Sequence, residues 1–291
     1  MQADCHIHMV LDGADWRAAM GRHQEAPNEA FIRRVLSRYQ ALGYTYLRDG
    51  GDRLKAGAKA REIAPAYGIT YRTPLAPLSK AGHYGGFIGL QYATLAEYTA
   101  LVLSQKAAGA DFVKIMISGL MDFDRPFVLT EEGLSPALIR ELVHIAHEEG
   151  QPVMAHCNGP RTIQAAAEAG ADSIEHGAYA DEEALSAMAE NQTIWVPTLS
   201  TIACLLPTPV GADAYGGSSP RHHPAGLQAI LDSAMENVSR FAAMGGLVAP
   251  GTDAGAHNVP HGSETELPLL HRCGLTEAAI TAAAQRLMAI F

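Results

Sequence analysis

The feature that most constrains the fold is a regular alternation of short β-rich runs with longer helix-like runs. The β-rich runs lie at residues 3–9, 44–49, 69–75, 111–117, 152–156, 171–176, 193–198 and 246–252. Between most of them, apolar residues spaced i, i+3 and i+4 predict helices. These helices cover residues 28–42, 54–67, 94–108, 135–149, 160–169, 181–190 and 224–244. Strands separated by helices pair in parallel, so this order predicts an α/β fold.

Glycines mark the predicted helix ends, because a helix often ends in a left-handed residue that glycine adopts without strain. Such glycines come just before the next strand at Gly43, Gly68, Gly109, Gly150 and Gly170. Eight β-α units in 291 residues favour a closed parallel barrel over an open sheet. We therefore predict one (β/α)8 TIM barrel domain over residues 1–291, with long loops at 76–93 and 200–223.

The charge balance excludes some classes of partner. The chain has 21 Lys and Arg against 31 Asp and Glu, a formal net charge of −10, which is unsuited to nucleic acid or an anionic membrane. No apolar run approaches the roughly 20 residues of a membrane-spanning helix. The four cysteines have no paired spacing and no secretory signal opens the chain. We expect a soluble cytoplasmic protein with a small-molecule substrate, which could form a homo-oligomer.

Histidines and an aspartate lie at or near the ends of four predicted strands. His6 and His8 are two residues apart, so on a strand both side chains point to the same side. His156 and His176 end the fifth and sixth strands, and Asp253 follows the eighth. Barrel active sites are built at the carboxyl ends of the strands. Imidazole and carboxylate groups are ligands that suit zinc or a similar divalent metal, so the pattern as a whole predicts a metal site.

Lys114 lies inside the apolar fourth strand, where an ammonium group is poorly solvated. Burial lowers the pKa of the amine and so increases the fraction of free amine. A free amine can react with carbon dioxide to form a carbamate, whose two oxygens can bridge two metal ions. The alternative is a buried lysine stem whose ammonium reaches a carboxylate such as that of Asp253. The surrounding histidines favour the carbamate.

This order of residues resembles the binuclear metal pattern of the amidohydrolase superfamily. The stretches "GYTYLRDGG", "FVKIMISG", "SIEHGAYADEEAL" and "GTDAGAHNVPHGSETELPLLHRCGLT" are similar to its branch of imidazolonepropionase-like proteins and metal-dependent Xaa-Pro dipeptidases, the prolidases. The resemblance implies two divalent metal ions, taken to be Zn²⁺. It implies His6, His8 and Asp253 on one ion, His156 and His176 on the other, and carbamylated Lys114 as the bridge.

The resemblance also implies hydrolysis of an amide bond in a dipeptide or an N-acyl amino acid. A hydroxide shared by both ions would attack the carbonyl, and Asp253 would act as the acid and base. His83, in the loop after the third strand, would be a second catalytic residue that binds the carbonyl oxygen. The further substrate-binding candidates are Tyr84, His257 and His261.

The sequence leaves other functions open. Two cations leave a positive potential near the metals, so we expect a substrate that carries a carboxylate. A lactone or phosphotriester hydrolase is the alternative enzyme, because sandwich-free barrels with this ligand set perform those reactions. A non-catalytic barrel relative is a third reading, and the intact ligand positions argue against it. Relatives of this branch also carry a small β-sandwich, and the expectation is that both of its segments are missing from this chain.

Overall fold

The computed structural model describes residues 2–207, 223–256 and 258–291. Its strands are β1 (Gln2–Ile7), β2 (Tyr44–Asp49), β3 (Thr70–Arg72), β4 (Leu78–Lys80), β5 (Leu90–Tyr92), β6 (Val113–Met116), β7 (Val153–Cys157), β8 (Ser173–His176) and β9 (Ile194–Val196). Its helices are α1 (Trp16–Gly21), α2 (Glu29–Ala41), α3 (Ala56–Ile63), the 3-10 helix η1 (Ala64–Tyr67), α4 (Leu95–Ala107), α5 (Pro136–Glu148), α6 (Pro160–Glu168), α7 (Glu182–Glu190), α8 (Ser200–Ala203), α9 (Pro224–Ala243), α10 (Glu266–Arg272) and α11 (Glu277–Ile290).

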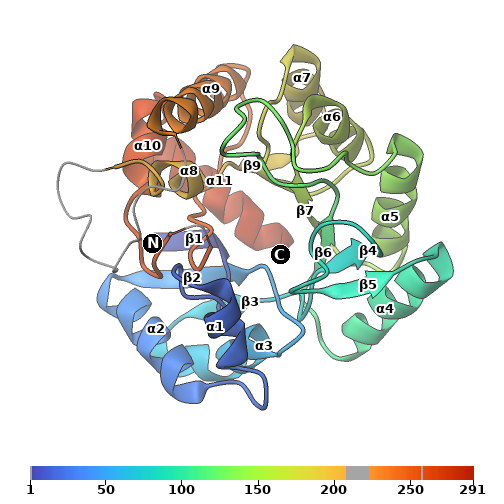
Figure 1. The fold of residues 1–291 in the computed structure, drawn as a ribbon, viewed down its shortest axis with the longest axis vertical. Coiled ribbons are helices and arrows are strands. Elements are labelled where there is room, and N and C mark those ends of the chain that lie inside the picture. The colour runs from blue at the N-terminus through green and yellow to red at the C-terminus, as the bar shows by residue number, and fades with distance from the viewer. Residues whose placement is uncertain (1, 208–222, 257) are drawn as a thin grey trace.

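Parallel strands lie inside a ring of helices (Figure 1), which confirms the predicted α/β class. Within the described ranges the strands form two sheets, of order β1-β2-β3 and β5-β4-β6-β7-β8-β9. No ladder of strand pairs joins these two sheets into a closed barrel in the described part of the chain. Backbone hydrogen bonds nevertheless link the sheet edges to neighbouring segments, for example from Asp111 N to Thr73 O and from Cys5 N to Pro250 O.

The predicted strands are all present except the last. Segment 246–252 is irregular and contributes one parallel bridge, between Val248 and Trp195. Pro250 has no N–H group to donate, which limits a regular ladder in this segment. The segment 76–93, predicted as a loop, contains the two short extra strands β4 and β5.

The helix boundaries follow the glycines. All five glycines predicted to end helices have positive φ angles, between 68° and 88°. Helix α4 starts at a capping box, in which Thr94 and Glu97 satisfy each other's backbone N–H groups. Short-range signals of this kind place helices within a residue or two of the positions read from the sequence.

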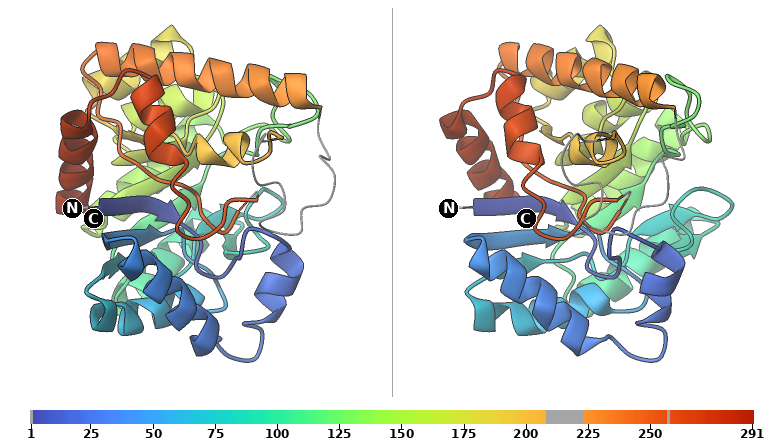
Figure 2. Two further views of the ribbon diagram at one scale, coloured as in Figure 1. Left: turned by 90° about the vertical axis from the view of Figure 1, so that its left-hand side faces the viewer. Right: turned by 60° about the vertical axis from the view of Figure 1, so that its left-hand side comes forward.

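Helix α11 lies across one end of the strands, near both chain termini (Figures 1 and 2). Its residue Leu287, together with Phe291, packs into a buried cluster with Cys5, Tyr46 and Phe112. This packing covers the amino ends of the strands, so their carboxyl ends face the opposite side of the molecule (Figure 2). Among the described residues, no helix combines the length and apolar character needed to span a bilayer.

Candidate metal centre

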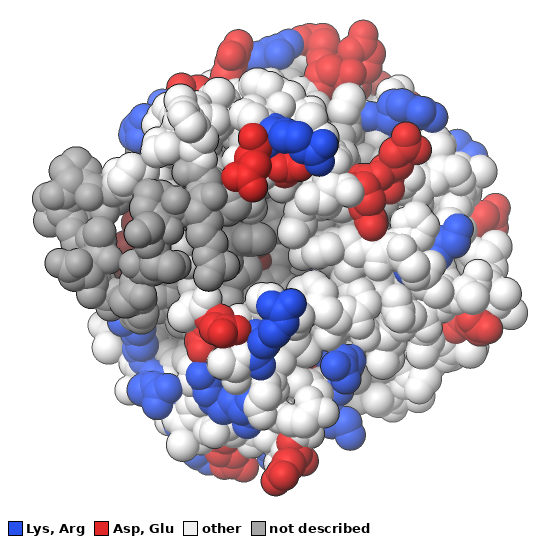
Figure 3. Space-filling view, in the orientation of Figure 1, with Lys and Arg blue, Asp and Glu red and all other residues white. Residues whose placement is uncertain are grey.

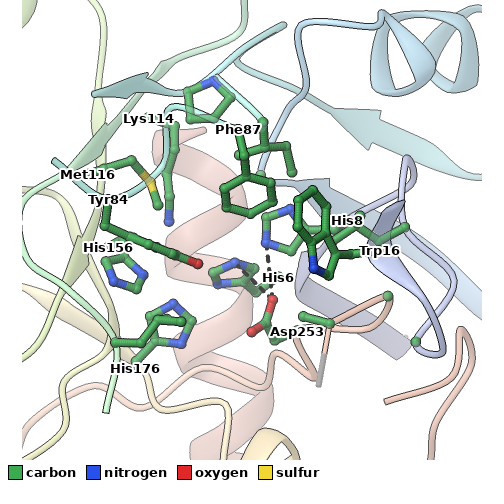
Figure 4. A pocket seen from close by; sticks show the side chains of 18 of the residues that line it. His6, His8, Trp16, Tyr84, Phe87, Lys114, Met116, His156, His176 and Asp253 are labelled. Carbon is green, nitrogen blue, oxygen red and sulfur yellow. Dashed lines mark ion pairs between the residues drawn. The ribbon is translucent and has the colours of Figure 1, made fainter. Parts of the chain in front are cut away.

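A cavity of about 380 Å³ opens at the carboxyl ends of the strands. It lies in the hollow seen near the middle of the molecular face in Figure 3, and Figure 4 shows its interior. The cavity is lined by all six predicted metal ligands, His6, His8, Lys114, His156, His176 and Asp253. The fold therefore brings together side chains that are far apart in the sequence.

His6, His8 and Asp253 form the tightest group, with one ligand-type atom from each lying within 4.8 Å of the others. Asp253 Oδ1 lies 3.1 Å from His8 Nε2 and 3.5 Å from His6 Nε2. His6 Nε2 and Asp253 Oδ1 are buried and have no hydrogen-bond partner among the described residues. Buried polar atoms seldom lack a partner. An imidazole nitrogen and a carboxylate oxygen left in this way, with His8 Nε2 beside them, fit a divalent cation such as Zn²⁺.

Lys114 and two histidines complete the inner end of the cavity. The ring centroids of His156 and His176 are 4.6 Å apart, and those of His6 and His176 are 5.1 Å apart. Lys114 Nζ is buried without a hydrogen-bond partner in the described part of the structure. Burial lowers the pKa of its amine to about 8. The alternative prediction, in which the ammonium of Lys114 pairs with a carboxylate such as that of Asp253, has no support in a hydrogen bond among the described residues.

Three of the predicted ligand histidines each use one ring nitrogen to contact the protein. His6 Nδ1 lies 2.7 Å from Glu175 Oε2, and His176 Nδ1 lies 2.7 Å from Thr198 Oγ1. His156 Nε2 lies 3.2 Å from a backbone carbonyl oxygen in the loop after β6. Metal-binding histidines usually hold their second nitrogen in this way, which fixes the ring orientation.

A buried ion pair holds Nδ1 of His6, and no pattern in the sequence predicted it. Arg48 Nη2 donates to Glu175 Oε1 at 2.7 Å, and both side chains are fully buried. Arg48 also donates to Ser173 Oγ at 2.9 Å and to the carbonyl oxygen of Cys5 at 2.8 Å. Burial opposes ionisation of Glu175, but the charge of Arg48 and the contact with His6 lower its pKa to about 2. The available signal was an arginine inside a buried strand, with no partner nearby in sequence.

The electrostatics of the ligand group suit a cation. Burial, followed by the charge of Lys114, lowers the pKa of His6 to about 4 and that of His156 to about 3. These histidines are therefore neutral near pH 7 and keep a lone pair for a ligand bond. Burial opposes ionisation of Asp253, yet the neighbouring His6 and His8 hold the pKa of its carboxyl group far below the usual value.

Two of the predicted ligands have unusual backbone conformations. His176 has φ of 66° and Asp253 has φ of 57°, a left-handed conformation that residues other than glycine rarely adopt. Such strain persists where surrounding contacts hold it, and it is concentrated at functional sites. The chain leaves β8 and segment 246–252 through these two residues, which turns both side chains into the cavity (Figure 4).

Of the two residues in the loop after β4 that were predicted to bind substrate, Tyr84 lines the cavity and His83 does not. The ring centroid of Tyr84 lies 5.1 Å from that of His156, and its hydroxyl oxygen is directed among the predicted ligands (Figure 4). His83 Nδ1 lies 3.6 Å from Oε1 of Glu131, which also accepts a hydrogen bond from the backbone N–H of Tyr84.

Of the two histidines predicted to bind substrate after segment 246–252, the structure describes His261 alone. His261 is buried, its Nε2 lies 3.0 Å from the carbonyl oxygen of Leu11, and its ring contacts Phe31 and Tyr39. It does not line the cavity. His257, also predicted to bind substrate, lies outside the described residues.

No family model matches the chain. In sequence, the chain is 29% identical over 282 residues to ochratoxinase of Aspergillus niger. The match covers 86% of this chain and 56% of that relative. The chain thus spans little more than half the length of the curated relative that it matches.

Solved structures share the fold over nearly the whole chain. A Xaa-Pro dipeptidase with bound methionine has a TM-score of 0.75 at 20% identity, covering 99% of this chain and 74% of that one. Ochratoxinase of Aspergillus niger has a TM-score of 0.74 at 25% identity, covering 97% and 68%. A putative prolidase from Bifidobacterium longum has a TM-score of 0.71 at 23% identity, covering 99% and 68%. In sequence and fold the chain is thus similar to ochratoxinase and to structures described as dipeptidases and prolidases, in agreement with the resemblance to the amidohydrolase superfamily indicated by the order of motifs from His6 to Asp253.

Proposed function

We propose that the protein is a metal-dependent hydrolase that cleaves an amide bond. The observation that carries this proposal is the set of buried atoms without hydrogen-bond partners at the inner end of the cavity, namely His6 Nε2, Lys114 Nζ and Asp253 Oδ1. A purely structural polar cluster would pair such atoms with one another or with the backbone. Relatives described as a dipeptidase and a prolidase support an amide as the bond that is cleaved.

The donor atoms support two zinc ions. We assign the first ion to His6, His8 and Asp253 and the second to His156 and His176. Lys114, as a carbamate, would supply an oxygen to each ion, because burial favours the free amine that reacts with carbon dioxide. When bound, the ions would lower the pKa of a water molecule and polarise the carbonyl group of the substrate.

The side chains of the cavity supply the proton transfers. Asp253 would accept the proton of the attacking water as the C–O bond forms, and return it to the nitrogen as the C–N bond breaks. The hydroxyl group of Tyr84 lies where it could donate a hydrogen bond to the carbonyl oxygen (Figure 4). His83, the residue predicted for this role, is the alternative donor. Its ring does not line the cavity, so its loop would have to move to bring it there.

We also propose a closed barrel, a substrate class and a cellular location. We propose that the two sheets and segment 246–252 together make a (β/α)8 barrel, with the hydrogen bonds at Asp111 and Pro250 as the links between them. The substrate would be a dipeptide or an N-acyl amino acid that carries a carboxylate. All four cysteines are free thiols, which is consistent with the reducing cytoplasm as the location.

Metal analysis combined with a substrate panel tests this function. We expect about two metal ions per chain, and hydrolysis of dipeptides or N-acyl amino acids that is lost on chelation and restored by Zn²⁺. The free acid should be cleaved at least about tenfold more efficiently than its C-terminal amide, the scale of one charge-assisted hydrogen bond. Preferred hydrolysis of a lactone or phosphotriester would replace the amide reaction. Metal binding without any turnover would favour a non-catalytic relative.

A further inference from the structure

The outer part of the cavity is built from aromatic side chains. Trp16, the first residue of α1, meets Phe87 edge-on with ring centroids 5.2 Å apart. Phe87 in turn lies 6.0 Å from Tyr84, whose ring lies 5.1 Å from the ligand His156. These rings form a continuous row from the mouth of the cavity to the proposed metal centre (Figure 4).

The exposure of Trp16 needs an explanation. Its side chain is 43% exposed, whereas Trp195, the other tryptophan of the chain, is 1% exposed. The guanidinium group of Arg17 lies over the Trp16 ring at 4.3 Å. An indole that lines a cavity at its open end, beside a second aromatic ring, offers an apolar surface that a ligand could cover.

The cavity lining separates into two chemical zones. The charged side chains among its described lining residues, Lys114 and Asp253, both belong to the proposed metal centre. Around Trp16 and Phe87 the lining is aliphatic or small and uncharged, and includes Leu11 and Ile88. A cavity of about 380 Å³ is within the range of small-molecule sites, so it can hold a flat ring and the reacting amide at once.

We propose that the substrate carries an aryl group that binds against Trp16 and Phe87 while its amide bond reaches the metal centre. This inference rests on the proposed function and adds the chemical class of the group next to the amide. An aryl ring can make edge-to-face contacts with both side chains, which a saturated ring of the same size cannot. The row of aromatic rings thus selects substrates by the group that they place at the mouth of the cavity.

Matched substrates test the aryl group without changing the reacting bond. N-phenylacetylglycine and N-cyclohexylacetylglycine place a ring on the acyl side, and N-acetylphenylalanine and N-acetylcyclohexylalanine place it on the amine side. We expect the aryl member of one pair to have a kcat/KM about two- to tenfold higher, the usual size of a pairwise aromatic interaction. Equal values within both pairs, with hydrolysis intact, would overturn the inference. Absence of hydrolysis of every amide would instead refute the proposed function.

Variants then show which residues produce the preference. Trp16→Leu and Phe87→Leu should each reduce the aryl-to-cyclohexyl ratio of kcat/KM towards one, because leucine keeps apolar surface but not the ring. The control is Phe127→Leu, since Phe127 is 59% exposed, packs on Tyr179 and does not line the cavity. It should keep the ratio of the parent protein. A preference that survives both Trp16→Leu and Phe87→Leu would overturn the assignment.

Tryptophan fluorescence gives a test that does not depend on turnover. Because Trp195 is buried, quenching by acrylamide reports mainly on Trp16. Phenylacetate should protect this emission from acrylamide in the metal-loaded protein, and cyclohexylacetate should protect it less. Trp16→Leu should abolish the effect. Equal protection by both acids, or protection that follows protein concentration rather than phenylacetate, would contradict an aryl site.

Discussion

Removing the charge of Glu175 should separate metal binding from folding, because this carboxylate has two different partners. One oxygen lies 2.7 Å from His6 Nδ1 and the other accepts from Arg48 Nη2 at 2.7 Å. Glu175→Gln keeps the size of the side chain but leaves Arg48 as a buried charge without its counterion. The free energy of unfolding of the metal-free protein should fall by about 3 to 5 kcal/mol, the cost of breaking a buried pair from one side.

The metal affinity should fall as well, for another reason. A carboxylate beside the second nitrogen of a metal-binding histidine orients the ring and raises its basicity, and losing it typically costs about 10- to 100-fold in affinity. The double variant Arg48→Met with Glu175→Leu removes both charges and replaces them with apolar groups. Its stability should recover towards that of the parent protein. Its metal affinity should stay low, because His6 Nδ1 still lacks an acceptor.

Urea unfolding of chelator-treated protein measures the stability, and competition titration with Zn²⁺ measures the affinity. The matched control is the surface pair Lys106 and Glu149, 3.0 Å apart with side chains 44% and 30% exposed. Removing either charge there should change the free energy of unfolding by less than about 1 kcal/mol and leave Zn²⁺ affinity unchanged. Parent-like Zn²⁺ affinity in Glu175→Gln, or recovery of both properties in the double variant, would refute the reasoning.

Three further variants address the chemistry of the cavity. Lys114→Ala should lose metal and activity, and short carboxylic acids with added metal should restore part of both; full metal content and turnover in this variant would refute the carbamate. Asp253→Asn should lower kcat by about 10² or more, with a smaller loss of metal measured on the same samples, and an unchanged kcat would exclude it as the acid and base. Tyr84→Phe should lower kcat by about 10² or more at unchanged metal content, and His83→Ala should lower kcat by less. A larger loss of kcat in His83→Ala than in Tyr84→Phe would assign the carbonyl contact to His83.

The sequence predicted the α/β class and the common location of the six candidate ligands, because both depend on local patterns. Strand and helix periodicity are read within windows of a few residues, and glycines such as Gly43 mark helix ends. In a fold of alternating strands and helices, the carboxyl ends of successive strands lie side by side. Residues as distant in sequence as His6 and Asp253 could therefore be expected in one place, and the cavity contains both.

What could not be predicted depends on pairings across the fold. Arg48 and Glu175 are 127 positions apart, and no local pattern links a buried arginine to one acid among several. Trp16 lies on a helix of 6 residues, too short for hydrophobic periodicity to be read. Pro250 interrupts the ladder of the last predicted strand. Its effect depends on whether a neighbouring strand has a carbonyl group at that position, which proline cannot hydrogen-bond because it lacks an N–H group. Such features require the coordinates of both partners.

Two glycines of the sequence motifs lie against the proposed metal ligands His6 and His8. A Cβ atom at Gly50, in the motif "RDGG" after β2, would overlap the imidazole ring of His8. A Cβ atom at Gly251, in "PGTDAG", would lie 2.9 Å from Cβ of His6 and would also clash with Val196. Each histidine of the first strand is therefore flanked by a neighbouring segment that must lack a side chain. A side chain at either position would therefore displace the proposed ligand histidine that it meets.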